Sequence, residues 1–82
     1  METTWGLEAR TSIGEWEHIG MFDTRGMALV AARQAYPSVA HTEDGDAVFG
    51  LMRDTVNGRQ MTEQVTIQRT ADGDLHLIEI FP

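Results

Sequence analysis

The chain has 82 residues, 13 of them acidic and 6 basic, which gives a formal net charge of −7 at neutral pH. This length accommodates a single domain over residues 1–82, and the absence of cysteine excludes disulfides, thiolate nucleophiles and cysteine-ligated zinc. The acidic balance and the lack of a basic run argue against direct nucleic-acid binding, which normally uses Lys and Arg to neutralise phosphates.

No stretch of the sequence approaches the ~20 apolar residues of a membrane span, and its first residues lack the pattern of a signal peptide. We therefore expect a cytoplasmic protein that makes no contact with a membrane. Because a chain of this size can bury only a marginal core, oligomerisation is one way in which it could gain buried area.

The first part of the chain predicts a β-hairpin. Residues 3–10 alternate between apolar and polar or small side chains, and residues 15–22 alternate again after a short link that contains Gly14. Two such runs joined by a glycine-containing turn are typical of a hairpin. Uninterrupted alternation places both Trp5 and Trp16 on the face that we assign to the core.

The next segment, residues 23–38, predicts a helix that is apolar nearly all round. Asp23 or Thr24 can cap its first turn, and Pro37 ends it because proline lacks a backbone N–H donor. The glycine-bearing loop at residues 20–26 matches neither the P-loop nor the dinucleotide-binding pattern. We interpret this loop as a structural connection that folds the helix back onto the sheet, and not as a ligand-binding loop.

The pattern of the second half of the chain is ambiguous. Residues 47–70 are consistent with a long hairpin around Asn57 and Gly58, a pair typical of a type I′ turn. The same apolar positions also have helical spacing over about residues 46–57. Gly50 in the middle of the run favours the hairpin, since glycine weakens a helix.

After a turn at residues 71–74, the apolar run at residues 75–81 lacks clean alternation, which favours a central strand covered on both faces. The sequence therefore predicts a two-layer α+β fold, with an antiparallel sheet and one helix packed on one face, in the order ββαβββ. The alternative is ββααββ, with a second helix at about residues 46–57.

Neither catalysis nor metal binding is indicated. The histidines and serines form no nucleophile-elbow or kinase pattern. The acidic segment at residues 41–46 breaks the ligand spacing of a calcium loop, and the segment at residues 72–74 has the Asp and Gly typical of tight turns. We expect no catalytic residues, no metal site and no cofactor.

Three groups of residues are candidate contact sites. Acidic side chains that could meet a basic partner surface are Glu8, Glu15, Glu17, Glu43, Asp44 and Asp46. An uncharged polar row that could pair or stack with another sheet consists of Thr62, Gln64, Thr66 and Gln68. The candidate aromatic anchors are Trp5 and Trp16.

These observations predict a small, acidic, non-catalytic protein-interaction module that could form a homodimer and whose partner is a protein with a basic surface. In a specific form of this hypothesis, the chain is a phage or mobile-element inhibitor whose carboxylates imitate nucleic-acid phosphates. Glu15 and Glu17, as alternate residues of a strand, would lie about 6.8 Å apart, roughly two phosphate steps of one DNA strand.

A second hypothesis comes from the pattern W…EAR…W…IG.FDT….A..AA, which covers about residues 5–35. It resembles the sheet-then-helix pattern of the AP2 domain and of integrase arm-binding domains. The resemblance implies DNA binding through a basic sheet. In this chain the corresponding strands carry Glu8, Glu15 and Glu17 against Arg10 alone. Such binding would require one face to collect Arg10, Arg53, Arg59 and Arg69.

A third hypothesis is a sensor or sequestering protein that holds a small ligand between subunits. The side chains that could contact such a ligand are Trp5, Trp16 and Tyr36.

Overall fold

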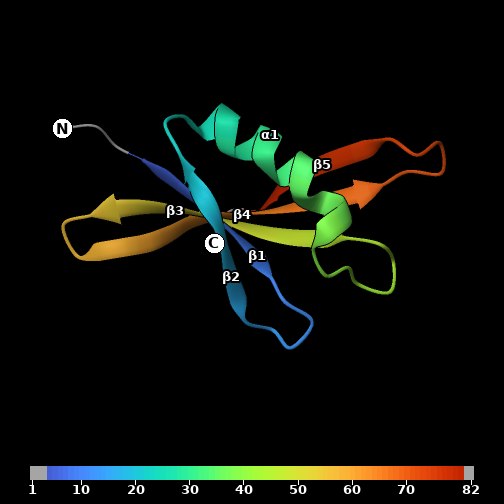
Figure 1. The fold of residues 1–82 in the computed structure, drawn as a ribbon, viewed down its shortest axis with the longest axis horizontal. Helices are drawn as coiled ribbons and strands as arrows, with labels where there is room; N and C mark the ends of the chain where they lie inside the picture. Colours follow the sequence, from blue (N-terminus) through green and yellow to red (C-terminus); the bar gives the residue numbers. More distant parts are fainter. Residues whose placement is uncertain (1–3, 81–82) are drawn as a thin grey trace.

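The computed structural model describes the backbone of residues 4–80 and the side chains of residues 4–78. The elements are β1 (Trp5–Arg10), β2 (Trp16–Phe22), α1 (Arg25–Ala35), a 3-10 turn (Tyr36–Ser38), β3 (Ala47–Thr55), β4 (Gly58–Arg69) and β5 (Leu75–Ile80). The strands form one antiparallel sheet in the order β2-β1-β3-β4-β5, and α1 lies against one face (Figure 1). The predicted order ββαβββ is confirmed, and the alternative second helix at 46–57 is wrong because that segment forms β3.

The core lies between α1 and the sheet. On the helix, the small side chains of Ala28 and Ala32 are fully buried, which lets the helix axis approach the strands closely. The largest fully buried side chains come from the sheet and are Leu7, Phe49, Leu51, Val65 and Ile67. The N-terminus of α1 is capped by Thr24, whose hydroxyl accepts a hydrogen bond from the Met27 N–H at 3.1 Å. No helix within residues 4–80 is long and apolar enough to cross a membrane.

Four tight turns share the pattern T-x-x-G. Their threonine and glycine pairs are Thr11 and Gly14, Thr42 and Gly45, Thr55 and Gly58, and Thr70 and Gly73. The four glycines have φ between 84° and 101°, and no other described residue has a positive φ. In three of the turns the threonine hydroxyl accepts a hydrogen bond from the N–H four residues later, at 3.1 Å each. Glycine is favoured there because a side chain in the left-handed region costs about 1–2 kcal/mol.

The turn between β3 and β4 differs from the predicted type I′ turn. Thr55 pairs with Gly58, so the two loop residues are Val56 and Asn57. A type I′ turn centred on Asn57 and Gly58 would need positive φ at both, but only Gly58 has it. The type I′ prediction is therefore wrong, although the hairpin itself is confirmed.

An irregularity in β2 overturns the predicted shared face of the two tryptophans. Leu7 pairs with Gly20 but Glu8 pairs with His18, so Ile19 is an extra residue in β2. Such a bulge reverses the alternation on one side of it. Trp5 consequently packs against the core, whereas Trp16 lies on the opposite face of the sheet.

The position of β5 also corrects the prediction of a central strand. β5 pairs only with β4 and forms an edge of the sheet. On the helix side Leu75 and Leu77 are half-buried, and on the other side His76 and Ile78 are exposed. The apolar run at residues 75–81 therefore does not mark a central strand, since no described element pairs with the outer edge of β5.

Candidate protein-interaction face

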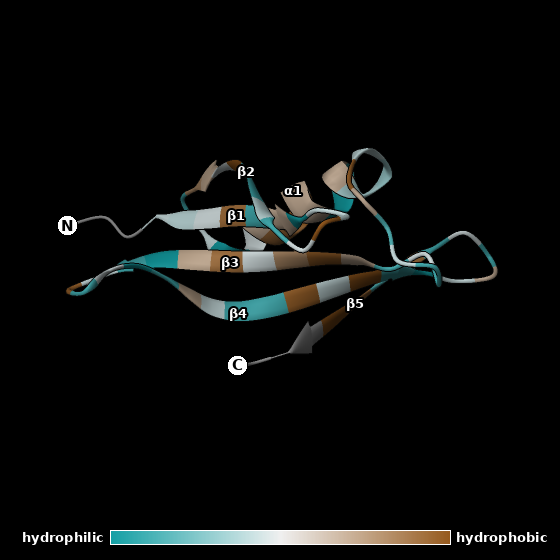
Figure 2. Ribbon diagram, turned by 90° about the horizontal axis from the view of Figure 1, so that it is seen from below, coloured by the Kyte–Doolittle hydropathy of each residue, from teal (hydrophilic) through white to brown (hydrophobic). Residues whose placement is uncertain are grey.

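One face of the sheet has no helix on it, and we call it the open face. Figure 2 looks onto this side of the molecule, with α1 behind the strands. The strand registers place alternate residues here, and those with side chains are Glu8, Arg10, Trp16, His18, Met21, Val48, Met52, Asp54, Arg59, Met61, Gln64, Thr66, Gln68, His76 and Ile78. The open face is therefore mixed in character, with apolar side chains from four strands.

Trp16 and Met61 cover Gly50 near the middle of the open face. A Cβ atom added at Gly50 would lie 2.5 Å from Met61 Cε and 3.3 Å from Cζ3 of the Trp16 ring. The two side chains therefore reach over the sheet from opposite directions, Trp16 from β2 and Met61 from β4. This arrangement depends on the absence of a side chain at Gly50.

A second contact of the same kind surrounds Gly6. A Cβ atom there would lie 3.3 Å from Met21 Sδ and 3.3 Å from Met52 Cβ. Met21 remains 40% exposed, and Arg59 Nη1 lies 3.3 Å from its sulfur atom. Methionine side chains are flexible and polarisable, so they can repack against partners of different shape.

Most charged groups on the open face have a partner within the chain. His18 Nδ1 lies 3.5 Å from a Glu8 carboxylate oxygen, and Arg59 Nε donates to Asp54 at 3.1 Å. The Arg10 guanidinium lies 5.4 Å from the centre of the Trp16 ring. The cores of protein-interaction surfaces are depleted of charged residues and enriched in aromatic residues, Met and Arg, and the open face carries Trp16, three methionines and two arginines.

The predicted polar row is present in part. Gln64, Thr66 and Gln68 lie on the open face and are half-buried. Thr62 does not belong to this row, because Leu51 pairs with Glu63 and Met52 with Met61, which leaves Thr62 as the extra residue of a bulge. The hydroxyl of Thr62 donates instead to the Leu51 carbonyl at 3.3 Å.

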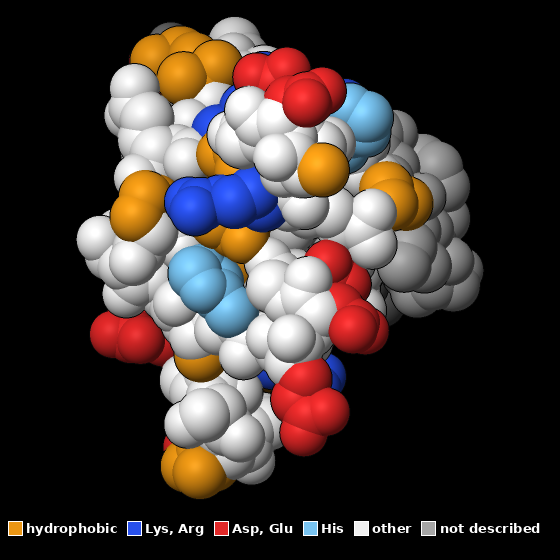
Figure 3. All heavy atoms as spheres, turned by 90° about the vertical axis from the view of Figure 1, so that its right-hand side faces the viewer, with side chains coloured by type: hydrophobic (Ala, Val, Ile, Leu, Met, Phe, Trp, Pro, Cys, Tyr) orange, Lys and Arg blue, Asp and Glu red, His pale blue; other side chains and the backbone are white. Residues whose placement is uncertain are grey.

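The six predicted acidic contact residues do not form one surface. Glu8 lies on the open face, whereas Glu17 pairs with Ala9 and lies on the helix side. Glu15 ends the β1–β2 turn, and Glu43 and Asp44 are exposed in the turn at 42–46. Asp46 begins the approach to β3 and accepts a hydrogen bond from Gln68 at 3.3 Å. At the end of the molecule that carries the turns at 42–46 and 70–74, acidic groups flank arginine and histidine side chains (Figure 3).

The arginines are divided between the two sides of the sheet. Arg53 stacks on Trp5 at 4.4 Å and Arg69 on Tyr36 at 5.4 Å, both on the helix side. Arg10 and Arg59 lie on the open face. The single basic face that DNA binding through the sheet would need is therefore not assembled.

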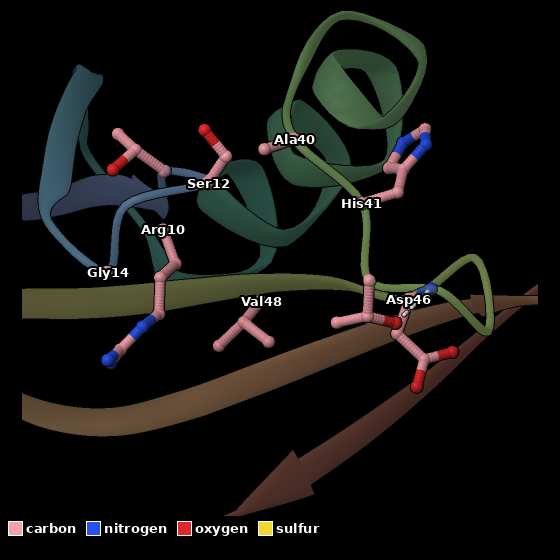
Figure 4. A pocket seen from close by; sticks show the side chains of 9 residues that line it. Arg10, Ser12, Gly14, Ala40, His41, Asp46 and Val48 are labelled. Atoms are coloured by element: carbon pink, nitrogen blue, oxygen red, sulfur yellow. Dashed lines mark hydrogen bonds between the residues drawn. The ribbon is translucent and has the colours of Figure 1, made fainter.

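A hollow of about 310 Å³ lies between the β1–β2 turn and the segment that leads into β3 (Figure 4). Its polar side chains already serve the fold, since the Thr11 and Thr42 hydroxyls accept turn N–H groups. The His41 ring stacks on Tyr36 at 4.3 Å, and its Nε2 atom lies 2.6 Å from the Tyr36 carbonyl oxygen. In Figure 4 the Arg10 and His41 side chains point in different directions, so they do not converge on a ligand position. Within the described residues, no group of three or more His, Cys, Asp or Glu could hold a metal ion.

Sequence reasoning missed the apolar centre of the open face. Gly50 was a usable signal, because a glycine inside a strand pattern often marks a close approach by another group. The bulges at Ile19 and Thr62 decide which residues reach that centre, and no periodic pattern announces them. Comparisons with protein-family models, with curated proteins and with solved structures gave no match.

Proposed function

We propose that the chain is a small, acidic, non-catalytic module that binds a protein partner through its open face. The observation that carries this proposal is the apolar centre formed by Trp16, Met21, Met52 and Met61 on a face that no described element covers. Contiguous apolar surface on a small protein often marks an interaction site. Trp is also enriched among the residues that dominate binding energy.

The partner that fits best is a protein with a basic surface around an apolar contact point. The net charge of −7 attracts such a surface over distance, while Trp16 and the methionines provide the close apolar contact. Glu8, which lies opposite Gly50 on the open face, and the exposed Glu15 in the β1–β2 turn would face basic groups of the partner, whereas Glu17 lies on the helix side. If those groups normally bind nucleic acid, the module acts as an inhibitor whose carboxylates take the place of phosphates.

The test is capture of the partner with three forms of the chain followed by affinity measurement on the purified pair. The forms are wild type, Trp16→Ala and Ile13→Ala. Ile13 is a matched control, because it is 77% exposed in the β1–β2 turn and lies outside the open face. Circular dichroism of each variant establishes that it is folded.

We expect wild type and Ile13→Ala to capture the same basic protein, and Trp16→Ala to lose at least tenfold in affinity. Binding should weaken steeply as salt rises, because salt screens the attraction between exposed opposite charges. Equal capture by folded Trp16→Ala, or affinity that does not change with salt, would reject the open face or the basic partner, respectively.

A further inference from the structure

The outer edge of β5 is an unprotected strand edge. β5 pairs with β4 without any register shift, so it is a regular strand whose other side has no partner among the described residues. Its residues 75–78 carry no Asp, Glu, Lys, Arg or Pro, and the one charged residue of β5 is Glu79, next to its end. Regular, apolar edges of this kind are the ones that pair with another strand, because half of their main-chain donors and acceptors point outward.

The opposite edge of the sheet, β2, is protected. A bulge at Ile19 breaks its regularity, whereas the pairing of β5 has no such irregularity. Bulges are among the devices that prevent edge-to-edge pairing, because they interrupt the regular spacing of the main-chain groups. One edge of the sheet is therefore closed to additional strands and the other is open.

We infer that two copies of the chain pair through β5 in an antiparallel manner and form a two-fold symmetric dimer with a continuous ten-stranded sheet. Each copy supplies an identical row of unpaired main-chain groups, so the contact is self-complementary. Since β2 is protected, β5 of one copy cannot pair with β2 of another to form a continuing series of copies. Association therefore stops at the dimer.

The two-fold symmetry restricts the register. Residues directly opposite each other in an antiparallel pair point to the same face, so a register that keeps both helices on one side must centre on a residue. The registers that pair nearly all of β5 centre on Leu77 or on Ile78. Either one covers apolar surface on both faces, because Leu77 is half-buried on the helix side and Ile78 is 42% exposed on the open face.

Charge and hydrogen bonding also favour this edge. Residues 75–78 are uncharged, and Glu79 would lie opposite Leu75 of the second copy in the register centred on Leu77 and opposite Leu77 in the register centred on Ile78, so no two charged residues of the two strands are paired directly. At the beginning of β5, Arg33 Nη2 donates to the Leu75 carbonyl at 3.0 Å. That carbonyl already has a partner, so the second copy would pair mainly with the residues after Leu75.

The test measures mass in solution by sedimentation velocity over a range of concentrations. Wild type is expected to reach twice the mass of one chain. Ile78→Lys should stay monomeric, because it places like charges close together across the two-fold axis. Ile13→Lys makes the same chemical change at an exposed residue between β1 and β2, at the opposite end of the strand order from β5, and should still dimerise. A monomeric wild type, or an unchanged Ile78→Lys dimer, would overturn the inference.

Cross-linking provides a second measurement if Ile78→Lys fails to fold. The chain has no cysteine, so Ile78→Cys and Ile13→Cys each introduce a single thiol. A short bifunctional maleimide should join Ile78→Cys chains into dimers and leave Ile13→Cys chains unjoined. Failure to cross-link Ile78→Cys would contradict pairing of two copies through β5, and it is also the result expected if β5 pairs with a strand of another protein instead.

This inference is independent of the proposed partner binding, and salt separates the two. Raising salt should strengthen association between two acidic copies and weaken binding to a basic partner. Trp16→Ala should retain the dimer and lose the partner. A dimer that Trp16→Ala disrupts would place the self-contact on the open face instead of on β5.

Discussion

Replacing Arg25 by methionine should destabilise the fold by leaving Glu63 without its cation. Arg25 Nε and Nη2 donate to the same Glu63 carboxylate oxygen at 3.0 and 2.6 Å, beneath the first turn of α1. The Glu63 side chain is 8% exposed and that of Arg25 is 33% exposed. Removing one member of a fully buried pair costs about 3–5 kcal/mol. Because a third of Arg25 is exposed, we expect about 2–3 kcal/mol.

The double variant distinguishes this reasoning from simple loss of packing. Arg25→Met/Glu63→Met removes both charges and keeps apolar volume. Its free energy of unfolding should therefore lie within about 1 kcal/mol of the wild-type value. The domain as a whole is expected to be stable by about 4–12 kcal/mol, so the single variants are measurable. Urea unfolding followed by tryptophan fluorescence gives all four free energies. A 2–3 kcal/mol loss should lower the melting temperature by roughly 8–24 °C.

The opposite outcome would refute the argument. If Arg25→Met and Glu63→Met each destabilise the domain and their effects simply add in the double variant, the two groups are not coupled. The ion pair would then contribute nothing beyond the packing of its two side chains.

Three further predictions concern stability. Phe49→Ala, at a fully buried position, should cost about 3–5 kcal/mol by urea unfolding, and a loss below ~1 kcal/mol would contradict the assigned core. Gly73→Ala should cost about 1–2 kcal/mol because φ is 88° there, whereas Gly26→Ala within α1 should be neutral or stabilise by up to ~1 kcal/mol. Equal effects of these two substitutions on the melting temperature would disprove the role of backbone conformation. Thr24→Ala should lower stability by about 1 kcal/mol through loss of the helix cap, and Thr24→Ser should retain most of it.

The order of elements could be predicted because each element leaves a local pattern. Strand alternation before and after Gly14, the cap and proline limits of α1, and the glycine turns all arise from interactions within a few residues. Steric preferences at that range are nearly independent of the rest of the fold. The local patterns that they produce can therefore be recognised in the sequence without knowledge of the final packing.

The candidate interaction face could not be predicted from such patterns. The extra residue Ile19 turns Trp16 away from the core, yet a bulge changes only one position and leaves the apparent period intact. The edge position of β5 and the pairing of Arg25 with Glu63 depend on contacts between distant segments. Those contacts depend on the order of the strands in the sheet, and no local pattern in a single sequence indicates that order.

The pairing of β1 with β3 has a consequence for how the molecule assembles. All other strand pairs join neighbours in the chain, whereas this one links positions 40 to 48 apart, from Ala9 with Phe49 to Trp5 with Arg53. Closing a loop of that size carries the largest loop-closure entropy among the four strand pairs, and contacts between such distant positions slow folding. The chain thus consists of a front piece of two strands and a helix and a rear piece of three strands. Formation of the β1–β3 pairing joins these two parts into one cooperatively folded unit.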